Sequence, residues 1–427
     1  MEANANWKRP FFTIWTGQAL SLTGSRIAMF ALIWWLTAET GSATVLATAT
    51  LFAMLPQIVL GPIAGVYVDR WNRRVTMMVA DSAIAGVSLW LAYLFWSDGI
   101  QVWHVYIIML ARELGGIFHW PAMQSSTALM VPNEHLTRVA GINQAMSGAL
   151  SIVGPALGAL LLSLVEIHHI MFMDVITATF AVVPLFVIAI PQPAHQTNGD
   201  GSLVRSSLWA DLREGFRYLT GWRGLMVITG MAMVFKIALT PAFSLMPLLV
   251  TDHFGGKAPQ LAGLESAMGV GVITGGLLLG VWGGFQRKIY TTLASIVVIG
   301  LSLVVVGLLP SNGYPLAIGL VLILGAAVAT TDGPLFAVLQ GSVAPEVQGR
   351  VFMLFGSLVT VTSPIGLAIA GPVTDLVGIQ FWYITAGVLC AGMGAWAFFV
   401  PAIAALEENK VGESLAGEVV PAPSAQA

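Results

Sequence analysis

The sequence predicts an all-α, polytopic membrane protein with twelve transmembrane helices arranged as two pseudo-symmetric six-helix bundles. Composition is the first reason, because 57% of the 427 residues are hydrophobic and only 9% are charged. A soluble core cannot bury that much apolar surface, and soluble chains carry roughly a quarter charged residues. Two further observations support the prediction: apolar runs of bilayer-spanning length recur along the chain, and its two halves share a pattern of glycines and prolines.

Twelve apolar runs are long enough to cross about 30 Å of hydrocarbon as helices. Their limits follow from the hydropathy along the chain. The predicted spans are 11–37, 44–68, 75–97, 103–130, 139–164, 169–190, 224–250, 261–283, 289–309, 314–341, 350–374 and 380–403.

These spans divide the chain into four parts. The parts are an N-terminal six-helix bundle in 1–190, a linker in 191–223, a C-terminal six-helix bundle in 224–403 and a tail in 404–427 that we expect to be disordered and cytoplasmic. Within the linker, Leu208, Leu212, Phe216 and Leu219 recur at helical spacing. This spacing is typical of an amphipathic helix on the cytoplasmic membrane surface, and a plain tether is the alternative.

Lys and Arg residues are distributed unevenly between the two predicted sides. Fourteen of the 18 fall near the chain ends or in even-numbered loops, and only Lys257 falls in an odd-numbered loop. By the positive-inside rule, both termini are cytoplasmic. The remaining three, Arg26, Arg112 and Lys236, lie inside predicted spans.

The two halves repeat one another at corresponding positions. Pro121 and Pro132 stand eleven residues apart at the end of the fourth span, and Pro334 and Pro345 repeat that spacing at the tenth. Duplicated halves place a substrate site between them, near the middle of the bilayer.

A polar cluster lies between the second and third spans, in the sequence GVYVDRWNRR. Gly65, Asp69, Arg70, Arg73 and Arg74 fit the loop signature Gly-x-x-x-Asp-Arg-x-x-Arg-Arg of the major facilitator superfamily, which the whole layout resembles. The glycine lets two helices approach closely, and the aspartate can pair with cations or a helix N-terminus. We expect a conformational clamp that holds the outward-open state, whereas simple anchoring by positive charge is the alternative for the arginines.

Two further stretches resemble antiporter signatures of that superfamily. In ARELGGIFHW, Arg112 and Gly116 match Arg-x-x-Gln-Gly, with Gly115 in place of the glutamine. The second stretch is the antiporter glycine motif of the fifth span, which matches at Gly141, Gly154, Pro155 and Gly158. In that motif Leu150 and Ala159 replace glycines. The resemblance implies proton-coupled export.

Several segments are similar to the macrolide-efflux branch of the superfamily. They are NWKRPFFTIWTGQALSL, TAETGSATVL, LPQIVLGPIAGVYVDR, PEVQGRVFMLFGSL and SPIGLAIAGP. The resemblance implies secondary active export of bulky amphipathic drugs such as macrolides across a bacterial cytoplasmic membrane by alternating access. A siderophore or other metabolite exporter of the same superfamily is one alternative, and an uncoupled solute facilitator is another.

Charged residues inside the predicted spans are the candidates for coupling, since each costs about 2.5–3.5 kcal/mol to insert without a partner or cavity. We assign proton coupling to Glu113 and Asp332, with Arg112 tuning one of them. Asp81, near the cytoplasmic end of its span, is expected to complete a cluster with Asp69 and Arg74 and so to have a structural role. Two other carboxylates, Asp174 and Glu265, are expected to lie near the outer ends of their spans, where water can reach them.

Large side chains and charges near these residues are candidates for the wall of a substrate cavity. They are Arg26, Phe30, Trp34, His119, Trp120, Lys236, Phe243, Met246 and Phe336. For each aromatic or Met residue, core packing is the simpler interpretation, and His119 is interpreted first as a hydrogen-bonded packing residue.

Other function classes lack their signatures. The chain contains no H-E-x-x-H, G-x-S-x-G or Walker A pattern, and its one cysteine, Cys390, has no partner. The sequence therefore predicts no enzyme, metal site or cofactor. With a net charge of −3 and no basic tract, we expect no nucleic-acid partner. The expected partners are a small amphipathic substrate, protons and the lipid bilayer, and the expected state is a monomer.

Overall fold

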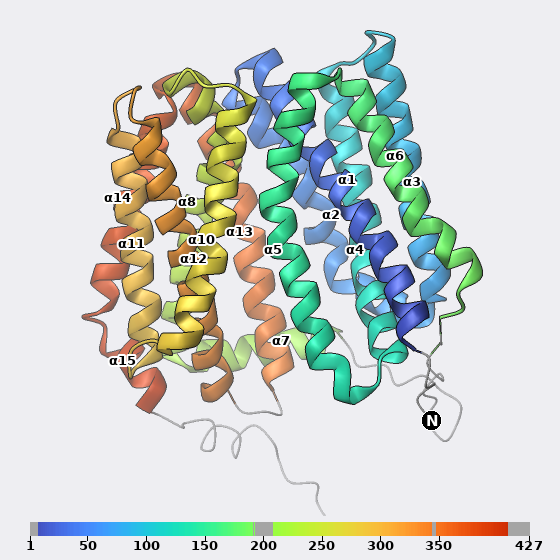
Figure 1. Ribbon diagram of the computed structural model, residues 1–427. Helices are drawn as coiled ribbons and strands as arrows, with labels where there is room; N and C mark the ends of the chain where they lie inside the picture. Colours follow the sequence, from blue (N-terminus) through green and yellow to red (C-terminus); the bar gives the residue numbers. More distant parts are fainter. Residues whose placement is uncertain (1–6, 191, 193–207, 344–346, 409–427) are drawn as a thin grey trace, which may run out of the picture.

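The computed structural model describes residues 7–190, 192, 208–343 and 347–408. Within those ranges all regular structure is helical, with no strand. Residues 191 and 193–207 of the predicted linker and 409–427 of the predicted tail lie outside the described residues. Figure 1 shows the long helices running side by side, each reversing the direction of the one before.

The first half contributes six long helices. They are α1 (Lys8–Thr40), α2 (Ala43–Arg70), α3 (Arg73–Trp96), α4 (Val102–Met130), α5 (Asn133–Leu164) and α6 (Ile167–Val187). The second half repeats this with α8 (Arg223–Ser244), α10 (Ala258–Trp282), α11 (Lys288–Leu308), α12 (Tyr314–Ser342), α13 (Gln348–Val377) and α14 (Ile379–Ala397).

Four shorter helices complete the described chain. They are α7 (Leu208–Gly221), α9 (Met246–Leu248), the π-helical turn η1 (Leu249–His253) and α15 (Pro401–Glu408). The predicted span 224–250 is thus divided among α8, α9 and η1. Pro241 lies inside α8 and Pro247 is the second residue of α9, and each lacks the amide hydrogen that a regular helix needs.

Twelve helices form the membrane-spanning bundle, as the sequence predicts. Among the described residues, ten have the length and apolar composition of a membrane span: α1, α2, α3, α5, α6, α8 and α10 to α13. The other two, α4 and α14, pack among these ten. Both are long enough to span a bilayer, and in α4 the charges of Arg112 and Glu113 lower the mean hydropathy.

The packing of the second half repeats that of the first. Helix α1 contacts α5 and α6 as α8 contacts α13 and α14, and α3 contacts α4 and α6 as α11 contacts α12 and α14. Between the halves, α2 packs against α13 and α5 packs against α10. When each helix is replaced by its counterpart in the other half, one interface becomes the other. The two six-helix bundles are therefore pseudo-symmetric.

Glycines allow the close helix contacts that hold each bundle together. A Cβ at Gly275 of α10 would lie 2.6 Å from the Cα of Ala326 in α12, and a Cβ at Gly271 would overlap the carbonyl oxygen of Leu322. Lipid tails are as apolar as the helix surfaces, so helices in a bilayer associate through such close packing.

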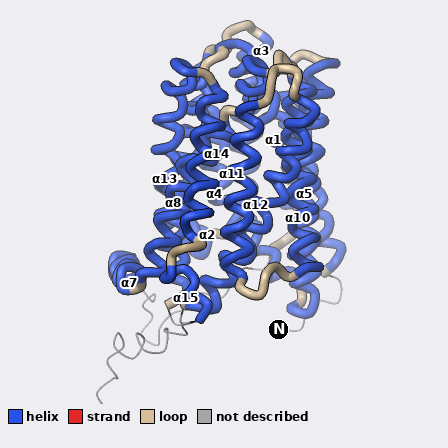
Figure 2. Tube along the Cα trace, turned by 90° about the vertical axis from the view of Figure 1, so that its left-hand side faces the viewer, coloured by secondary structure: helices blue, strands red, loops and turns tan. Residues whose placement is uncertain are grey.

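The two ends of the molecule differ. One end, which we call the α7 end, carries the start of α1, helix α7 and helix α15 (Figures 1 and 2). Toward the opposite end, apolar clusters join both bundles, for example through Leu36 with Leu245 and Phe30 with Met246. Near the α7 end, the clusters of the described chain each belong to one bundle. The bundles are therefore packed together at the opposite end and separated at the α7 end.

Candidate functional site

A polar cavity of about 500 Å³ lies within the first bundle, between α1, α2, α3 and α4. Its wall includes the candidate residues Arg26, Arg112, Glu113, His119 and Trp120. Four of the spans thus turn polar side chains toward one another and away from lipid, which is where a charge in a bilayer is tolerated. Of the charges predicted inside the spans, Arg26, Arg112 and Glu113 thus lie around this cavity.

Arg112 is held in a buried ion pair. Its Nη1 lies 2.6 Å from Oδ2 of Asp174 on α6, and the two side chains are 6% and 2% exposed. Ser88 of α3 accepts a hydrogen bond from Arg112 and donates one to Asp174, while Ser25 of α1 donates to the other carboxylate oxygen. The expectation that water reaches Asp174 is wrong. The pair is buried because α1, α3 and α6 close around it, and its hydrogen bonds offset the loss of solvation.

Asp81 faces inward rather than toward the loop. Gln18 of α1 donates a hydrogen bond of 2.9 Å to its Oδ2, and Nε2 of His119 lies 3.3 Å from its Oδ1. Arg74 instead donates to the carbonyl oxygens of Leu185 and Phe186 at the end of α6. The expected contact of Asp81 with Arg74 is therefore wrong: the two residues lie two turns apart along α3, about 10 Å, so their side chains reach different neighbours.

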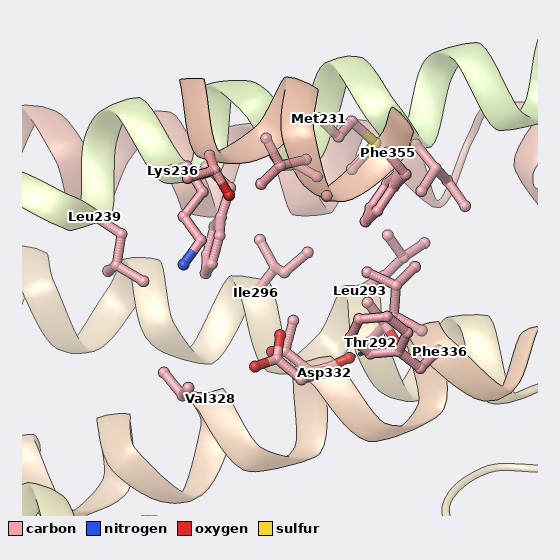
Figure 3. Close-up of a pocket in the computed structure, with 18 of the residues that line it drawn as sticks. Met231, Lys236, Leu239, Thr292, Leu293, Ile296, Val328, Asp332, Phe336 and Phe355 are labelled. Atoms are coloured by element: carbon pink, nitrogen blue, oxygen red, sulfur yellow. Dashed lines mark hydrogen bonds between the residues drawn. The ribbon is translucent and has the colours of Figure 1, made fainter. Parts of the chain in front are cut away.

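A second, apolar cavity of about 350 Å³ lies within the other bundle, between α8, α11, α12 and α13. Its wall holds five phenylalanines: Phe235, Phe243, Phe336, Phe352 and Phe355. Figure 3 shows Lys236 of α8 and Asp332 of α12 extending into it from opposite walls. A large apolar surface with two opposite charges suits an amphipathic ligand that carries a polar or ionised group.

A groove of about 280 Å³ between α2 and α13 lies beside both cavities. It shares Gln57 and Gly61 with the polar cavity, and Phe352, Gly356 and Thr360 with the apolar cavity. The three hollows adjoin one another across the bundle interface and offer more room than either cavity alone.

Three other candidates for the cavity wall lie elsewhere. Phe30, Trp34 and Met246 belong to the apolar cluster that joins the bundles toward the opposite end. In the present conformation they pack the bundle interface.

The family follows from comparison with known proteins. The sequence model of the Major Facilitator Superfamily matches residues 14–367. The chain belongs to the major facilitator superfamily. It is thus a multi-pass membrane transporter and not an enzyme.

Relatives within the superfamily include named efflux proteins. The chain is 36% identical over 390 residues to Macrolide efflux protein A of Streptococcus pyogenes, covering 91% of this chain and 95% of that protein. It is 29% identical to Multidrug efflux pump Tap of Mycobacterium tuberculosis, covering 92% and 94%. The crystal structure of the nucleoside transporter NupG superposes with a TM-score of 0.70 at 13% identity, covering 94% of this chain and 100% of that one, which shows the shared fold.

The superfamily's loop signature spans the end of α2 and the start of α3. Gly65, Asp69 and Arg70 lie in the last turns of α2, and the side chains of Asp69 and Arg70 are outside the described part of the structure. Arg73 Nη1 donates to the carbonyl oxygen of Ser125 on α4, at 3.3 Å. Together with the Arg74 contacts to α6, this bond fixes the start of α3 between two neighbours. Cationic side chains at carbonyl oxygens suit the negative end of a helix.

Asn72, which replaces a glycine of the signature, is the N-cap of α3. Its side-chain oxygen accepts a hydrogen bond from the amide of Val75 at 3.2 Å. The departure from the family pattern therefore has a local structural role.

The glycine motif of α5 divides into two parts. A Cβ at Gly154 would lie 2.9 Å from Cβ of Arg26, and one at Gly158 would lie 2.7 Å from Cδ1 of Phe30. These glycines and the buried Pro155 seat α5 against α1. A Cβ at Gly141 would have no atom of the described residues within 4 Å, so Gly141 makes no close helix contact here.

Sequence reasoning missed one polar contact between the bundles. Asp375, in the last turn of α13, accepts hydrogen bonds from the amides of Ala43 and Thr44 at 2.6 and 3.0 Å and from Ser42 Oγ at 3.0 Å. An aspartate at the end of a predicted span was a detectable signal, but its partner is 332 positions away.

Proposed function

We propose that this protein is a secondary active exporter that couples the entry of protons to the efflux of bulky amphipathic drugs such as macrolides by alternating access. The observation that carries the proposal is the row of adjoining hollows that leads from a phenylalanine-lined cavity to a polar cavity across the bundle interface. The kinship with Macrolide efflux protein A supports the substrate class.

The proposal places the α7 end in the cytoplasm of a bacterium, because Lys and Arg concentrate in the loops at that end. With the opposite end closed by apolar packing and by Asp375, the structure corresponds to the inward-facing state. A drug enters between α2 and α13, and its apolar body rests on the phenylalanines of the second bundle. The transporter acts as a monomer, since both cavities lie within a single chain.

Coupling requires a group that gains and loses a proton during the cycle. Asp332 and Glu113 can do so, whereas Arg112 cannot deprotonate in a protein and is held by Asp174. A proton taken from the outside neutralises the carboxylate and weakens the binding of a cationic drug there. Return to the inward-facing state releases the proton, and the next drug is bound.

A siderophore or another acidic metabolite is the second candidate substrate. Arg26 lines the polar cavity and Lys236 lines the apolar one, so each cavity offers a cation to an anionic ligand. In that case export depends on these two residues more than on Asp332.

Transport into inside-out membrane vesicles tests these alternatives. We expect a labelled macrolide to accumulate when the vesicles are energised and to leak out when a protonophore collapses the proton gradient. Vesicles without the protein are the control. If the macrolide only equilibrates across the membrane, with or without the protonophore, the protein is an uncoupled facilitator. Uptake of a siderophore in place of the macrolide would indicate the second candidate substrate.

A further inference from the structure

A titratable pair in the polar cavity has no role in the scheme above. Asp81 of α3 and His119 of α4 both line the cavity, and their side chains are 7% and 9% exposed. His119 Nε2 lies 3.3 Å from Asp81 Oδ1. The two residues are 38 positions apart, and only the contact of α3 with α4 brings them together.

The two members of the pair are held differently. Gln18 fixes Asp81 by donating to Oδ2, which leaves Oδ1 directed at the imidazole. His119 Nε2 has no well-aligned hydrogen bond to any described group in this conformation. Such a nitrogen, buried and facing both a carboxylate and a cavity, needs only a small ring movement to form or break its contact. Pro121, two residues further along α4, removes one backbone hydrogen bond of that turn and eases this movement.

The position of the pair suits a route for protons. Asp81 follows the start of α3 by eight residues, which is about 12 Å of helix from the α7 end. Glu113 lies six residues before His119, about 9 Å deeper along α4. From the α7 end inward, the cavity thus presents Asp81 with His119, then Glu113, and then Arg112 with Asp174 behind it.

We propose that Asp81 and His119 form a proton-binding pair that passes coupling protons from Glu113 to the cytoplasm. This inference rests on the proposed proton-coupled export. The neutral imidazole accepts a proton at Nε2, and the resulting imidazolium pairs with the Asp81 carboxylate. It then returns the proton to water that enters from the α7 end. Histidine suits this step because it changes charge near neutral pH.

Few other ionisable groups face the pair. From α1, Arg26 lines the same cavity and Gln18 is neutral; from α4 itself come Arg112 and Glu113. Asp174 of α6 is engaged by Arg112, and Arg74 of α3 is engaged by carbonyl oxygens. Of α2, the neutral Gln57 lines the cavity, while Asp69 and Arg70 have side chains outside the described part. The pH response of the pair is therefore set mainly by its own two members, Arg26 and Glu113.

The test compares net transport with exchange in proteoliposomes containing purified full-length protein and a labelled macrolide. Proton-driven transport needs proton release, whereas drug exchange at equilibrium does not. For His119→Gln we expect net transport to fall at least about tenfold more than exchange, and we expect loss of the rise and fall of transport between about pH 6 and 8. Asp81→Asn keeps an oxygen that can accept the hydrogen bond from Gln18, and it should likewise lose more net transport than exchange.

His104→Gln is the matched control. His104 is also a buried histidine of α4, but it lies in the first turn at the opposite end, where its ring accepts a hydrogen bond from the Gln101 amide. It should keep the wild-type pH profile. A wild-type profile in His119→Gln and Asp81→Asn would overturn the inference and make the pair a packing contact. If either variant is unstable, the pH profile of transport in the other variant decides whether the inference holds. Absence of gradient dependence in the wild-type protein would instead refute the proposed function.

Discussion

Asp375 of α13 accepts a hydrogen bond of 2.6 Å from the backbone amide of Ala43 and so joins the two bundles at the opposite end. The same carboxylate accepts from Thr44 and Ser42, at the positively polarised N-terminus of α2. Under the proposed alternating access, this contact would stabilise the conformation in which the opposite end is closed.

Replacing Asp375 by Ala should open that end more often. An exposed charge at a helix N-terminus contributes up to about 1 kcal/mol, which corresponds to a roughly fivefold shift between states. Spin labels at Ser97→Cys and Ser311→Cys, on loops of different bundles, should report a larger population of long distances. Asp98→Asn, a change of charge at the same end, is the control. Identical distance distributions would mean that Asp375 has no part in closure.

Breaking the Arg112–Asp174 pair should destabilise the protein strongly. Removing one partner leaves an uncompensated buried charge, at a cost of about 3–5 kcal/mol. Arg112→Gln and Asp174→Asn should each lower the thermal unfolding midpoint in detergent, and the double variant should be less destabilised than the sum of the two. Strict additivity would show that the pair is not energetically coupled.

Substitution of the carboxylates proposed for coupling should separate transport from binding. Asp332→Asn and Glu113→Gln remove a titratable group without changing its size. At least one of them should lose gradient-driven macrolide transport and retain macrolide binding or exchange. If both variants pump at the wild-type rate, the coupling proton binds elsewhere.

Two adjacent glycines of α10 should respond differently to a methyl group. Gly275→Ala places a Cβ 2.6 Å from the Cα of Ala326, and such overpacking against backbone costs about 1–3 kcal/mol. Gly276→Ala meets no described atom within 4 Å and serves as the control. Thermal unfolding should show a lower midpoint for Gly275→Ala alone. Equal midpoints would indicate that α10 and α12 can move apart without a loss of thermal stability.

The proposed orientation can be tested with single cysteines. Ser97→Cys lies at the opposite end and Gln286→Cys at the α7 end, and both positions are exposed. An impermeant thiol reagent added to intact cells should label the first and not the second. The native Cys390 is fully buried, so the unmodified chain provides the background. Labelling of Gln286→Cys in intact cells would reverse the topology.

The sequence by itself determined the architecture, because the bilayer imposes length and polarity on every segment. Hydropathy located the spans, including α4, whose two charges lower its apolar character. The repeated spacing of Pro121 and Pro334 from a second proline predicted the duplicated halves, which the equivalent contacts of α1 and α8 display. Since an intramembrane charge needs a partner or a cavity, Arg112 and Asp332 could also be singled out in advance.

Only the tertiary structure decided which side chains meet. Hydropathy gives the depth of a residue along its helix, but the rotation of the helix and the choice of neighbour depend on packing between distant segments. Arg112 therefore pairs with Asp174, 62 positions away, and Asp81 meets Gln18 and His119 instead of the nearby Arg74. Asp375 reaches Ala43 only because α2 and α13 pack across the two halves.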